Sequence, residues 1–422
     1  MSWENNYIQF KSKENLDSMA ASQLRTDSFD RFLKSGLPTR KEEAWKYTSL
    51  NNFKQIEWKS GNDEVHLSAL QMQEISKKIP AEFYNIVFIN GKLNFNLSDE
   101  IPQVQLNELT SLDFNQSEKH VEVNLLNLAN AFLSKKVVIH VNKNQIVDKP
   151  LQILMIQTSP SSTFYSEKIN IKIDENAELT LIMHTMSFES SQPSALNVNT
   201  TIAMADSAKV KFIQLQNQDL NSFHFSQTEV ILNSNSQFQS LAMSVGSVLT
   251  RNYFHLNFLG RHSFAGVDGL TTLNSKQHVD NYTYIQHFIG ENQSVQHYKS
   301  ILSGSAQSVF RGRVRIEPDA QKANSEQLNN NLLLTREAQA NSIPQLEIYA
   351  DDVKAGHGST IGQLNKEEIF YFLSRGINQY EAVKMLSYGY AKELVLKFEN
   401  QVVQNFLMAT LQDKLERMIQ ND

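Results

Sequence analysis

The motif Ile173-Asp174-Glu175-Asn176-Ala177 returns as Met204-Ala205-Asp206-Ser207-Ala208, Leu232-Asn233-Ser234-Asn235-Ser236 and Leu259-Gly260-Arg261-His262-Ser263. Looser copies follow as Ile289-Gly290-Glu291-Asn292-Gln293, Leu302-Ser303-Gly304-Ser305-Ala306 and Ile316-Glu317-Pro318-Asp319-Ala320. Each copy has an apolar residue, two variable residues, a turn-forming residue and a small or polar residue. The apolar positions lie 31, 28, 27, 30, 13 and 14 residues apart, so the later intervals are about half the earlier ones.

These copies lie within a long strand-rich segment, from about residue 124 to residue 349. Short β-type runs such as Ile169 to Ile173 and Lys209 to Leu215 are separated by Asn, Ser, Gly and Asp, and helical periodicity is almost absent. Such a segment could form a sandwich, a barrel, a propeller or a solenoid. The repeat favours a solenoid of stacked coils, with the apolar residues inside and the polar residues at the corners between sheets.

The two flanks have different patterns. Before about residue 115, helical and extended patterns are mixed, and Asn90-Gly91 between alternating apolar residues predicts a hairpin with a type I′ turn. After Gly362 the periodicity is helical, with Asn365 and Asn378 in position to cap two helices and Glu368 as a reciprocal partner for Asn365. A third apolar series extends almost to the end, so we expect a helical C-terminal domain.

Composition excludes several classes of protein. The 422 residues carry a net charge of -6, without basic runs, so nucleic acid is not an expected partner. The first eleven residues lack a basic segment followed by an apolar one, and no run of 18 apolar residues occurs, which predicts a cytoplasmic protein without a membrane span. Cysteine is absent, so any sulfur ligand for a metal must come from another chain.

Common catalytic motifs are missing from the sequence. The phosphate loop, the dinucleotide-binding GxGxxG, the GxSxG elbow and HExxH do not occur. Five histidines lie between His255 and His297, with spacings of 7, 16, 9 and 10 that match no standard metal site. Asp351 and Asp352 could offer carboxylates to a cation, but a surface turn is the simpler interpretation. A β-helix could also carry the paired acids of a carbohydrate lyase or hydrolase, which is our alternative hypothesis.

One histidine stands in an unusual setting. His357 lies between Gly356 and Gly358 at the end of the strand-rich segment, where bulky neighbours cannot enclose the imidazole. The simpler interpretation is a turn that joins two domains. The functional interpretation is that His357 is a metal ligand.

Several strings together resemble the SufB/SufD family. They are Phe310-Arg311-Gly312-Arg313, Asp319-Ala320-Gln321-Lys322, Asn329-Asn330-Asn331-Leu332-Leu333-Leu334, Pro344-Gln345-Leu346-Glu347-Ile348-Tyr349-Ala350-Asp351-Asp352-Val353-Lys354, His357-Gly358, Ile361-Gly362-Gln363-Leu364 and Phe370-Tyr371-Phe372-Leu373-Ser374-Arg375-Gly376-Ile377. The opening Leu37-Pro38-Thr39-Arg40-Lys41-Glu42-Glu43-Ala44-Trp45-Lys46-Tyr47-Thr48 is similar to the SufD branch in particular, and the lack of cysteine favours SufD over SufB.

The resemblance implies a mainly β fold with a right-handed parallel β-helix. We expect a largely helical α/β domain over residues 1–120, the β-helix over 121–360 and a helical domain over 361–422. It also implies a non-catalytic scaffold subunit for iron-sulfur cluster assembly, which pairs with a SufB-like paralog through the β-helices and docks SufC-type ABC ATPases on its C-terminal helices. In isolation the chain could form a homodimer by the same surface.

The resemblance also assigns residues to these roles. His357 matches a family histidine implicated in cluster assembly at the paired interface, and neutral imidazole can bind iron. Many relatives have cysteine two positions earlier, where this chain has Ala355. We therefore expect no tightly bound cofactor in this chain alone, and only transient iron or a nascent cluster in the complex. The candidates for ATPase docking are Phe370, Phe372, Leu373, Arg375, Tyr380, Met385 and Tyr388.

Overall fold

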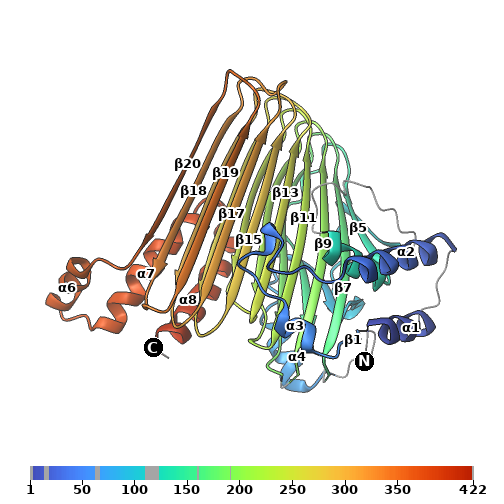
Figure 1. Ribbon diagram of the computed structural model, residues 1–422, viewed down its shortest axis with the longest axis horizontal. Coiled ribbons are helices and arrows are strands. Elements are labelled where there is room, and N and C mark those ends of the chain that lie inside the picture. Colours follow the sequence, from blue (N-terminus) through green and yellow to red (C-terminus); the bar gives the residue numbers. More distant parts are fainter. Residues whose placement is uncertain are drawn as a thin grey trace.

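The body of the protein is a flattened solenoid of two β-sheets that lie face to face (Figure 1). The computed structural model describes residues 3–13, 19–61, 67–109, 123–158, 161–190 and 192–420. From β5 onward the chain alternates between the sheets, and from β7 onward each strand pairs in parallel with the strand two places before it. The predicted parallel β-helix is therefore confirmed.

Each sheet has ten strands among the residues that the structure describes. Sheet A contains β1 (Lys59–Ser60), β4 (Val104–Leu109), β5 (Lys136–Val141), β7 (Thr163–Ile173), β9 (Ser194–Met204), β11 (Ser222–Leu232), β13 (Leu249–Phe258), β15 (His278–His287), β17 (Gln307–Ile316) and β19 (Gln339–Ile348). Sheet B contains β2 (Tyr84–Ile89), β3 (Lys92–Leu93), β6 (Leu151–Gln157), β8 (Glu178–Ser187), β10 (Lys209–Asn217), β12 (Gln237–Ser244), β14 (Phe264–Leu273), β16 (Gln293–Leu302), β18 (Asn324–Leu333) and β20 (Lys354–Gly362).

The core between the sheets is built from stacked apolar residues in parallel register. At one end of sheet A the stack consists of Ile173, Met204, Leu232, Phe258, His287 and Ile316. The apolar position of the motif was therefore assigned wrongly in two copies. Phe258 takes the place expected for Leu259, and His287 takes the place expected for Ile289. The turns after β13 and β15 are one residue longer than those after β7, β9 and β11, which accounts for the offset of one residue at Leu259. The looser copy at Ile289 was placed one further residue too late. Leu259 is instead 44% exposed.

The shortened intervals of the repeat have a simple cause. Each coil has two strands and thus two turns, and the copies at Ile289 and Ile316 lie at one end of the strands while the copy at Leu302 lies at the other. In the first four copies the turn-forming residue has a positive φ, for example 58° at Asn176 and 60° at Ser207. Asn tolerates this left-handed conformation better than most residues, which explains the polar preference at that position.

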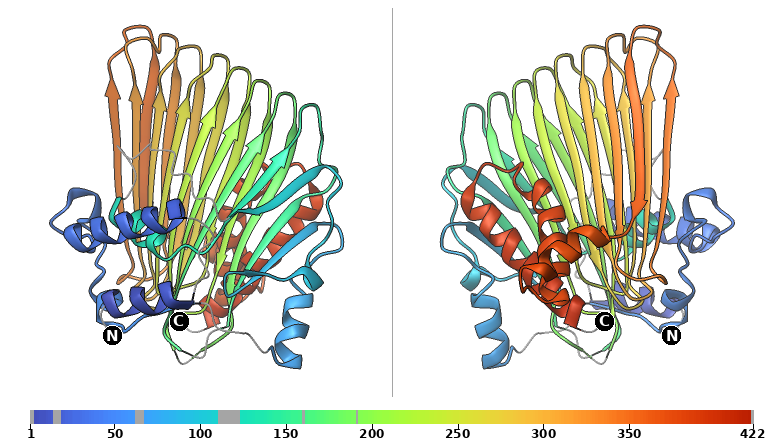
Figure 2. Two further views of the ribbon diagram at one scale, coloured as in Figure 1. Left: turned by 90° about the vertical axis from the view of Figure 1, so that its right-hand side faces the viewer. Right: turned by 90° about the vertical axis from the view of Figure 1, so that its left-hand side faces the viewer.

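Helices cover the outer faces of both sheets (Figure 2). The N-terminal helical segments are α1 (Trp3–Lys13), α2 (Met19–Ser35), η1 (Glu43–Trp45), α3 (Asn51–Gln55), α4 (Ala69–Ser76), η2 (Phe95–Leu97) and α5 (Val123–Ala131), and the C-terminal ones are α6 (Lys366–Ser374), α7 (Gln379–Val395) and α8 (Gln401–Gln420). Helices α1, α2, α3 and α5 pack on sheet A, whereas α7 and α8 pack on sheet B. None of the helices in the described residues is long and apolar enough to cross a membrane.

Two local predictions in the N-terminal part can be compared with the structure. The hairpin is present, because β2 and β3 pair antiparallel around Asn90 (φ 49°) and Gly91 (φ 80°). The predicted boundary near residue 120 lies outside the described residues. Strands β2, β3 and β4 extend the two sheets, so part of this N-terminal region belongs to the solenoid body.

The N-terminal segment is fastened to sheet A by a buried charge cluster. Arg251 forms an ion pair with Asp280, and the ring of Trp45 lies 4.6 Å from the Arg251 guanidinium carbon. Thr48 donates a hydrogen bond to the same aspartate, while Arg311 donates to the backbone oxygen of Glu43 at 2.8 Å. Breaking any of these interactions would be costly, because the partner that stays buried would have no hydrogen bond or opposite charge.

The turn conformation provides a test of the repeat. Replacing the exposed Asn235 (φ 58°) with Val should lower the free energy of unfolding by about 1–2 kcal/mol, because a β-branched residue is strained at positive φ. Urea unfolding followed by circular dichroism would measure the change. Asn235→Gly is the matched control and should be almost neutral. An equal loss in both variants would contradict a conformational origin.

Candidate functional site

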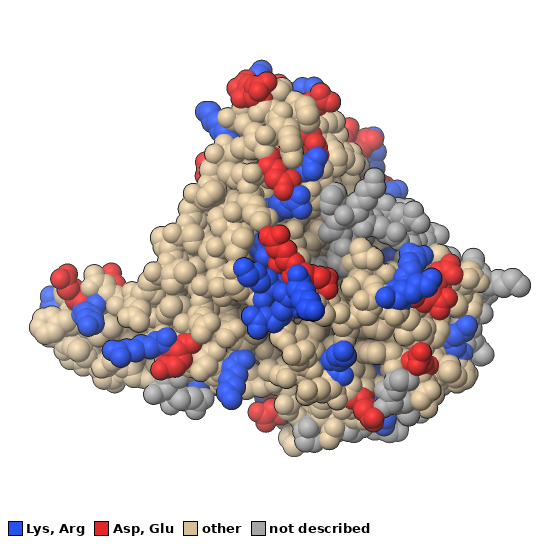
Figure 3. Space-filling model, in the orientation of Figure 1, with Lys and Arg blue, Asp and Glu red and all other residues tan. Residues whose placement is uncertain are grey.

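The solenoid ends at the C-terminal side with two strands that have a neighbour on one side only. Within the described residues, β19 pairs with β17 alone and β20 pairs with β18 alone. Each of these edge strands has a single charged residue, Glu347 in β19 and Lys354 in β20. Accordingly, the surface over the last strands shows almost no Lys, Arg, Asp or Glu side chains in Figure 3. Edge strands of soluble proteins are usually protected by charges, so an unprotected edge suits a partner.

His357 lies in the middle of the edge strand β20. It is exposed, and its register neighbour on β18 is Gln327. Side chains alternate along a strand, so His357 is on the same side as Ala355, which packs against the core between the sheets. The imidazole therefore stands at the open end of the space between the sheets. The interpretation of this segment as a mere joining turn is wrong.

The surroundings of His357 are small and polar. A side chain at Gly356 would meet no atom within 4 Å, and one at Gly358 would meet only Leu328. Gln327 is 1% exposed, yet neither its Nε2 nor its Oε1 has a hydrogen-bond partner among the described residues. Sequence reasoning missed Gln327, whose place beside His357 depends on a pairing thirty residues apart. A buried amide without partners is costly and is commonly completed by another molecule.

The described residues do not contain a complete metal site. No group of three or more His, Asp or Glu side chains lies close enough together in this part of the chain to hold a metal ion. The histidines between His255 and His297 are likewise not gathered into one. His287, for example, stacks on Phe258 and lies 3.0 Å from the hydroxyl of Ser294. The exposed turn at Asp351 and Asp352 also fits the simpler interpretation.

Helix α6 projects away from the body (Figure 1) and has no buried residue. Asn365 caps it by accepting from the Glu367 amide at 2.8 Å, so the cap was predicted, although no reciprocal contact of Glu368 is present among the described interactions. Four of the docking candidates, Phe370, Leu373, Arg375 and Met385, are exposed, while Phe372, Tyr380 and Tyr388 are half-buried. Phe370 is 70% exposed. The structure thus separates the solvent-facing candidates from the packed ones.

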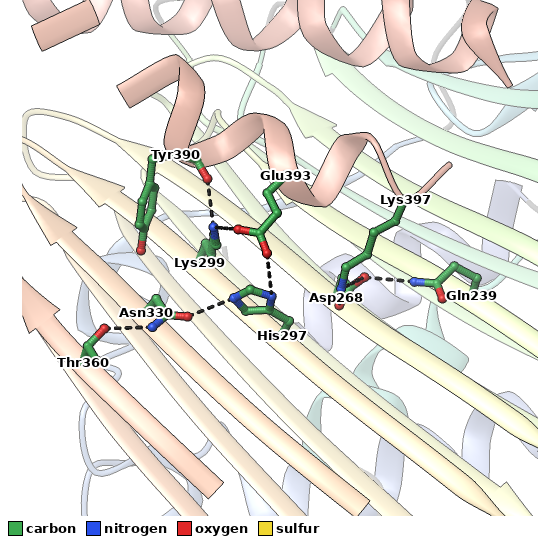
Figure 4. A network of polar contacts seen from close by, with 9 residues as sticks. All are labelled: Gln239, Asp268, His297, Lys299, Asn330, Thr360, Tyr390, Glu393 and Lys397. Carbon is green, nitrogen blue, oxygen red and sulfur yellow. Dashed lines mark hydrogen bonds and ion pairs between the residues drawn. The ribbon is translucent and has the colours of Figure 1, made fainter. Parts of the chain in front are cut away.

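Helix α7 and the turn that follows it are held on sheet B by two ion pairs of opposite polarity (Figure 4). The Lys397 ammonium lies 2.8 and 2.9 Å from the carboxylate oxygens of Asp268, and Glu393 pairs with Lys299. Burial raises the pKa of Asp268 to about 6 even though Lys397 opposes the shift. The hydrogen bond from Lys299 lowers the pKa of Glu393. Glu393 binds a cation of the sheet, and Lys397, four residues later, binds an anion of the sheet. Because the two charges differ in sign, only one position and one direction of this segment satisfy both.

The same network continues to the edge strand. His297 Nδ1 lies 3.9 Å from Glu393, and its Nε2 lies 2.9 Å from the side-chain oxygen of Asn330. Asn330 then donates to the hydroxyl of Thr360 at 2.8 Å. Thr360 is three residues from His357 on β20 (Figure 4). A continuous set of polar contacts therefore joins the C-terminal helices to the strand that carries the candidate ligand.

Comparison with known proteins identifies the family. Residues 155–390 match the core domain described as "SUF system FeS cluster assembly, SufBD core domain", and residues 1–153 match the SufBD N-terminal region. The chain belongs to the SufBD family. The resemblance inferred from the motifs is thereby confirmed.

Individual relatives agree with this assignment to SufBD. The iron-sulfur cluster assembly protein SufD of Escherichia coli is 28% identical over 397 residues, with 91% of each chain covered. A SufBD family protein of Synechocystis is 26% identical over 405 residues, which cover 91% of this chain and 87% of the relative. The chloroplastic protein ABCI7 of Arabidopsis thaliana is 24% identical, with 92% and 85% covered. These relatives support a SufD-type subunit, and they lend no support to a carbohydrate-active enzyme.

The Asp268 pair gives a test of how α7 is anchored. Lys397→Met should lower the free energy of unfolding by about 1–3 kcal/mol, because a carboxyl with 0% side-chain exposure would lose its cation. Lys392→Met is the control, since this exposed lysine lies in the last turn of α7, just before the turn that carries Lys397. Thermal or urea unfolding would compare the two. Equal stability of both variants would show that the buried pair does not anchor the helix.

Proposed function

We propose that this chain is a SufD-type scaffold subunit whose open solenoid end pairs with a SufB-like paralog. The observation that carries the proposal is the unpaired, weakly charged edge of β20 beside an exposed histidine. Strand β20 offers backbone N–H and C=O groups along its whole length, whereas Pro344 removes one donor from β19. In the absence of its paralog, the same edge would pair two copies of this chain into a homodimer.

His357 would take part in binding iron or a nascent iron-sulfur cluster at this paired edge. Neutral imidazole is a suitable iron ligand, and the partner would supply thiolate or carboxylate donors, because the chain has no cysteine and its described residues form no group of three or more ligands. Such a shared site exists only in the complex. Iron would therefore be held transiently as the cargo of assembly, and no cofactor would stay bound to this chain alone.

Helix α6 would form part of the docking site for a SufC-type ABC ATPase. Phe370, Tyr371 and Leu373 are 70%, 57% and 43% exposed, which is a large apolar surface for a helix of nine residues. Arg375 lies 5.4 Å from the ring centre of Tyr371 and adds a cation at the edge of this surface. Aromatic residues with an adjacent arginine are typical of strong protein contacts.

Force from the ATPase would reach the paired edge through α7. The ion pairs of Glu393 and Lys397 make α7 move with sheet B, and Asn330 joins this network to Thr360 (Figure 4). A displacement of α6 and α7 on nucleotide binding would therefore shift β20 and its histidine. Catalysis would lie with the ATPase, and the scaffold itself would act as a non-enzymatic cytoplasmic subunit.

Replacement of the histidine tests the cluster role. His357→Ala should leave folding and ATPase binding unchanged but lower the yield of cluster in the reconstituted complex, because one ligand is lost. Cluster absorbance and bound iron would be measured after reconstitution. The control is His262→Ala, an exposed histidine in a turn between β13 and β14. A wild-type yield in His357→Ala would refute a role for this imidazole.

The docking surface can be tested independently. Phe370→Asp should weaken ATPase binding by about 10-fold or more, the loss expected for a contact residue at the centre of an interface. Its melting temperature should stay that of the wild type, since the side chain is exposed. Phe95→Asp is a matched control, because Phe95 is 77% exposed at the opposite end of the molecule. Equal ATPase affinity of both variants would contradict docking through α6.

A further inference from the structure

A cavity lies at the N-terminal end of the solenoid, opposite to the edge strands. It has a volume of about 400 Å³ and is lined by described residues from β1, β2, β3, β4, β5 and β7 and from the helical segments beside them. The cavity exists because β7 is longer than β5. Strand β5 starts opposite Lys168, whereas β7 starts five residues earlier at Thr163, and β1 covers only Thr163 and Phe164. The inward side chains of β7 just before Lys168, which are Tyr165 and Glu167, therefore line the cavity.

Glu167 is a buried acidic residue that lines this cavity. It belongs to the inward side of β7, like Ile169 and Ile171, and is only 8% exposed. Among the described interactions its carboxyl has neither a hydrogen bond nor an ion pair. Gly91 lies against it, since a side chain there would come within 2.7 Å of the Glu167 Oε1 atom. An unpartnered carboxyl in such a place is costly for the fold and marks a candidate binding site.

The charges around the cavity indicate the sign of the missing partner. Burial, with a smaller effect of Glu108, raises the pKa of Glu167 to about 8. Lys135 also lines the cavity, but it lies 3.4 Å from the carboxylate of Glu108 and is paired with it. Lys92 is likewise engaged in an interaction of its own. Glu167 is thus an acid without a partner of opposite charge, and a bound cation would supply that partner.

The remaining lining is rich in aromatic rings. Phe88 comes from β2, Phe132 follows α5, and Phe164 and Tyr165 come from β7. Phe10 and Phe95 add two further rings. Aromatic faces attract cations and also accept an apolar body. A cavity of this volume is in the range of small-molecule sites.

We propose that this cavity binds an organic cation, a primary ammonium group on an aromatic body, with the ammonium against Glu167. The aromatic body would pack among the phenylalanines. This site is remote from the edge strands and from α6, so it does not depend on the assembly function proposed above.

Phenethylammonium is a suitable probe for calorimetry on the full chain at pH 7. Because free Glu167 is mostly protonated at this pH, binding of the ammonium should release close to one proton, about 0.9 for a pKa near 8. Titrations in two buffers of different ionisation enthalpy measure that proton. Glu167→Gln should abolish the release and weaken binding by about 10- to 100-fold, the worth of a charge-assisted hydrogen bond.

The matched probe is 2-phenylethanol, which has the same body without the charge. Its affinity should be similar for the wild type and Glu167→Gln, and Glu167→Gln should melt like the wild type at pH 7 because the acid it replaces is neutral there. Binding of phenethylammonium without proton release by the wild-type chain would overturn the proposal. So would the absence of binding at about 10 mM ligand, a concentration that detects a Kd near 1 mM.

Discussion

The parallel hydrogen-bond ladder is the constraint on which the rest of this molecule depends. A strand has backbone donors and acceptors on both edges, and an interior strand such as β11 meets both needs with β9 and β13. The last coil cannot do so, because β19 and β20 have no following coil in the described chain. The repetition that stabilises the body therefore also leaves the last coil with open hydrogen-bonding edges.

Features that depend on neighbouring residues were predictable from the sequence. Asn90-Gly91 specified a hairpin, and Asn365 and Asn378 each cap a helix where expected, because a side-chain oxygen needs only the amide two or three residues ahead. The repeat also predicted stacked coils, since apolar residues return at every turn. Its phase failed at Leu259, where one additional residue in the turn cannot be recognised without knowing which side chain faces inward.

Features that depend on register were out of reach. His357 was singled out by its flanking glycines and by the resemblance, but its neighbour Gln327 is brought there by strand pairing. The pair of Lys397 and Asp268 joins residues 129 positions apart, and only the packing of α7 on sheet B brings them together. In the sequence, Glu167 looks like an ordinary residue of a strand in which apolar and polar side chains alternate. It becomes unusual only because the neighbouring strand β5 is shorter.

The two ends of the solenoid differ in a way that limits its assembly. At the N-terminal end, β3 and β4 run antiparallel to their neighbours, and β3 has only two residues. Reversed strands interrupt the parallel register, so this end offers no template that matches β20. Head-to-tail stacking of identical copies needs two ends that match, and these two ends differ in strand direction. The asymmetry therefore counts against fibre formation, the usual hazard of long stacked sheets.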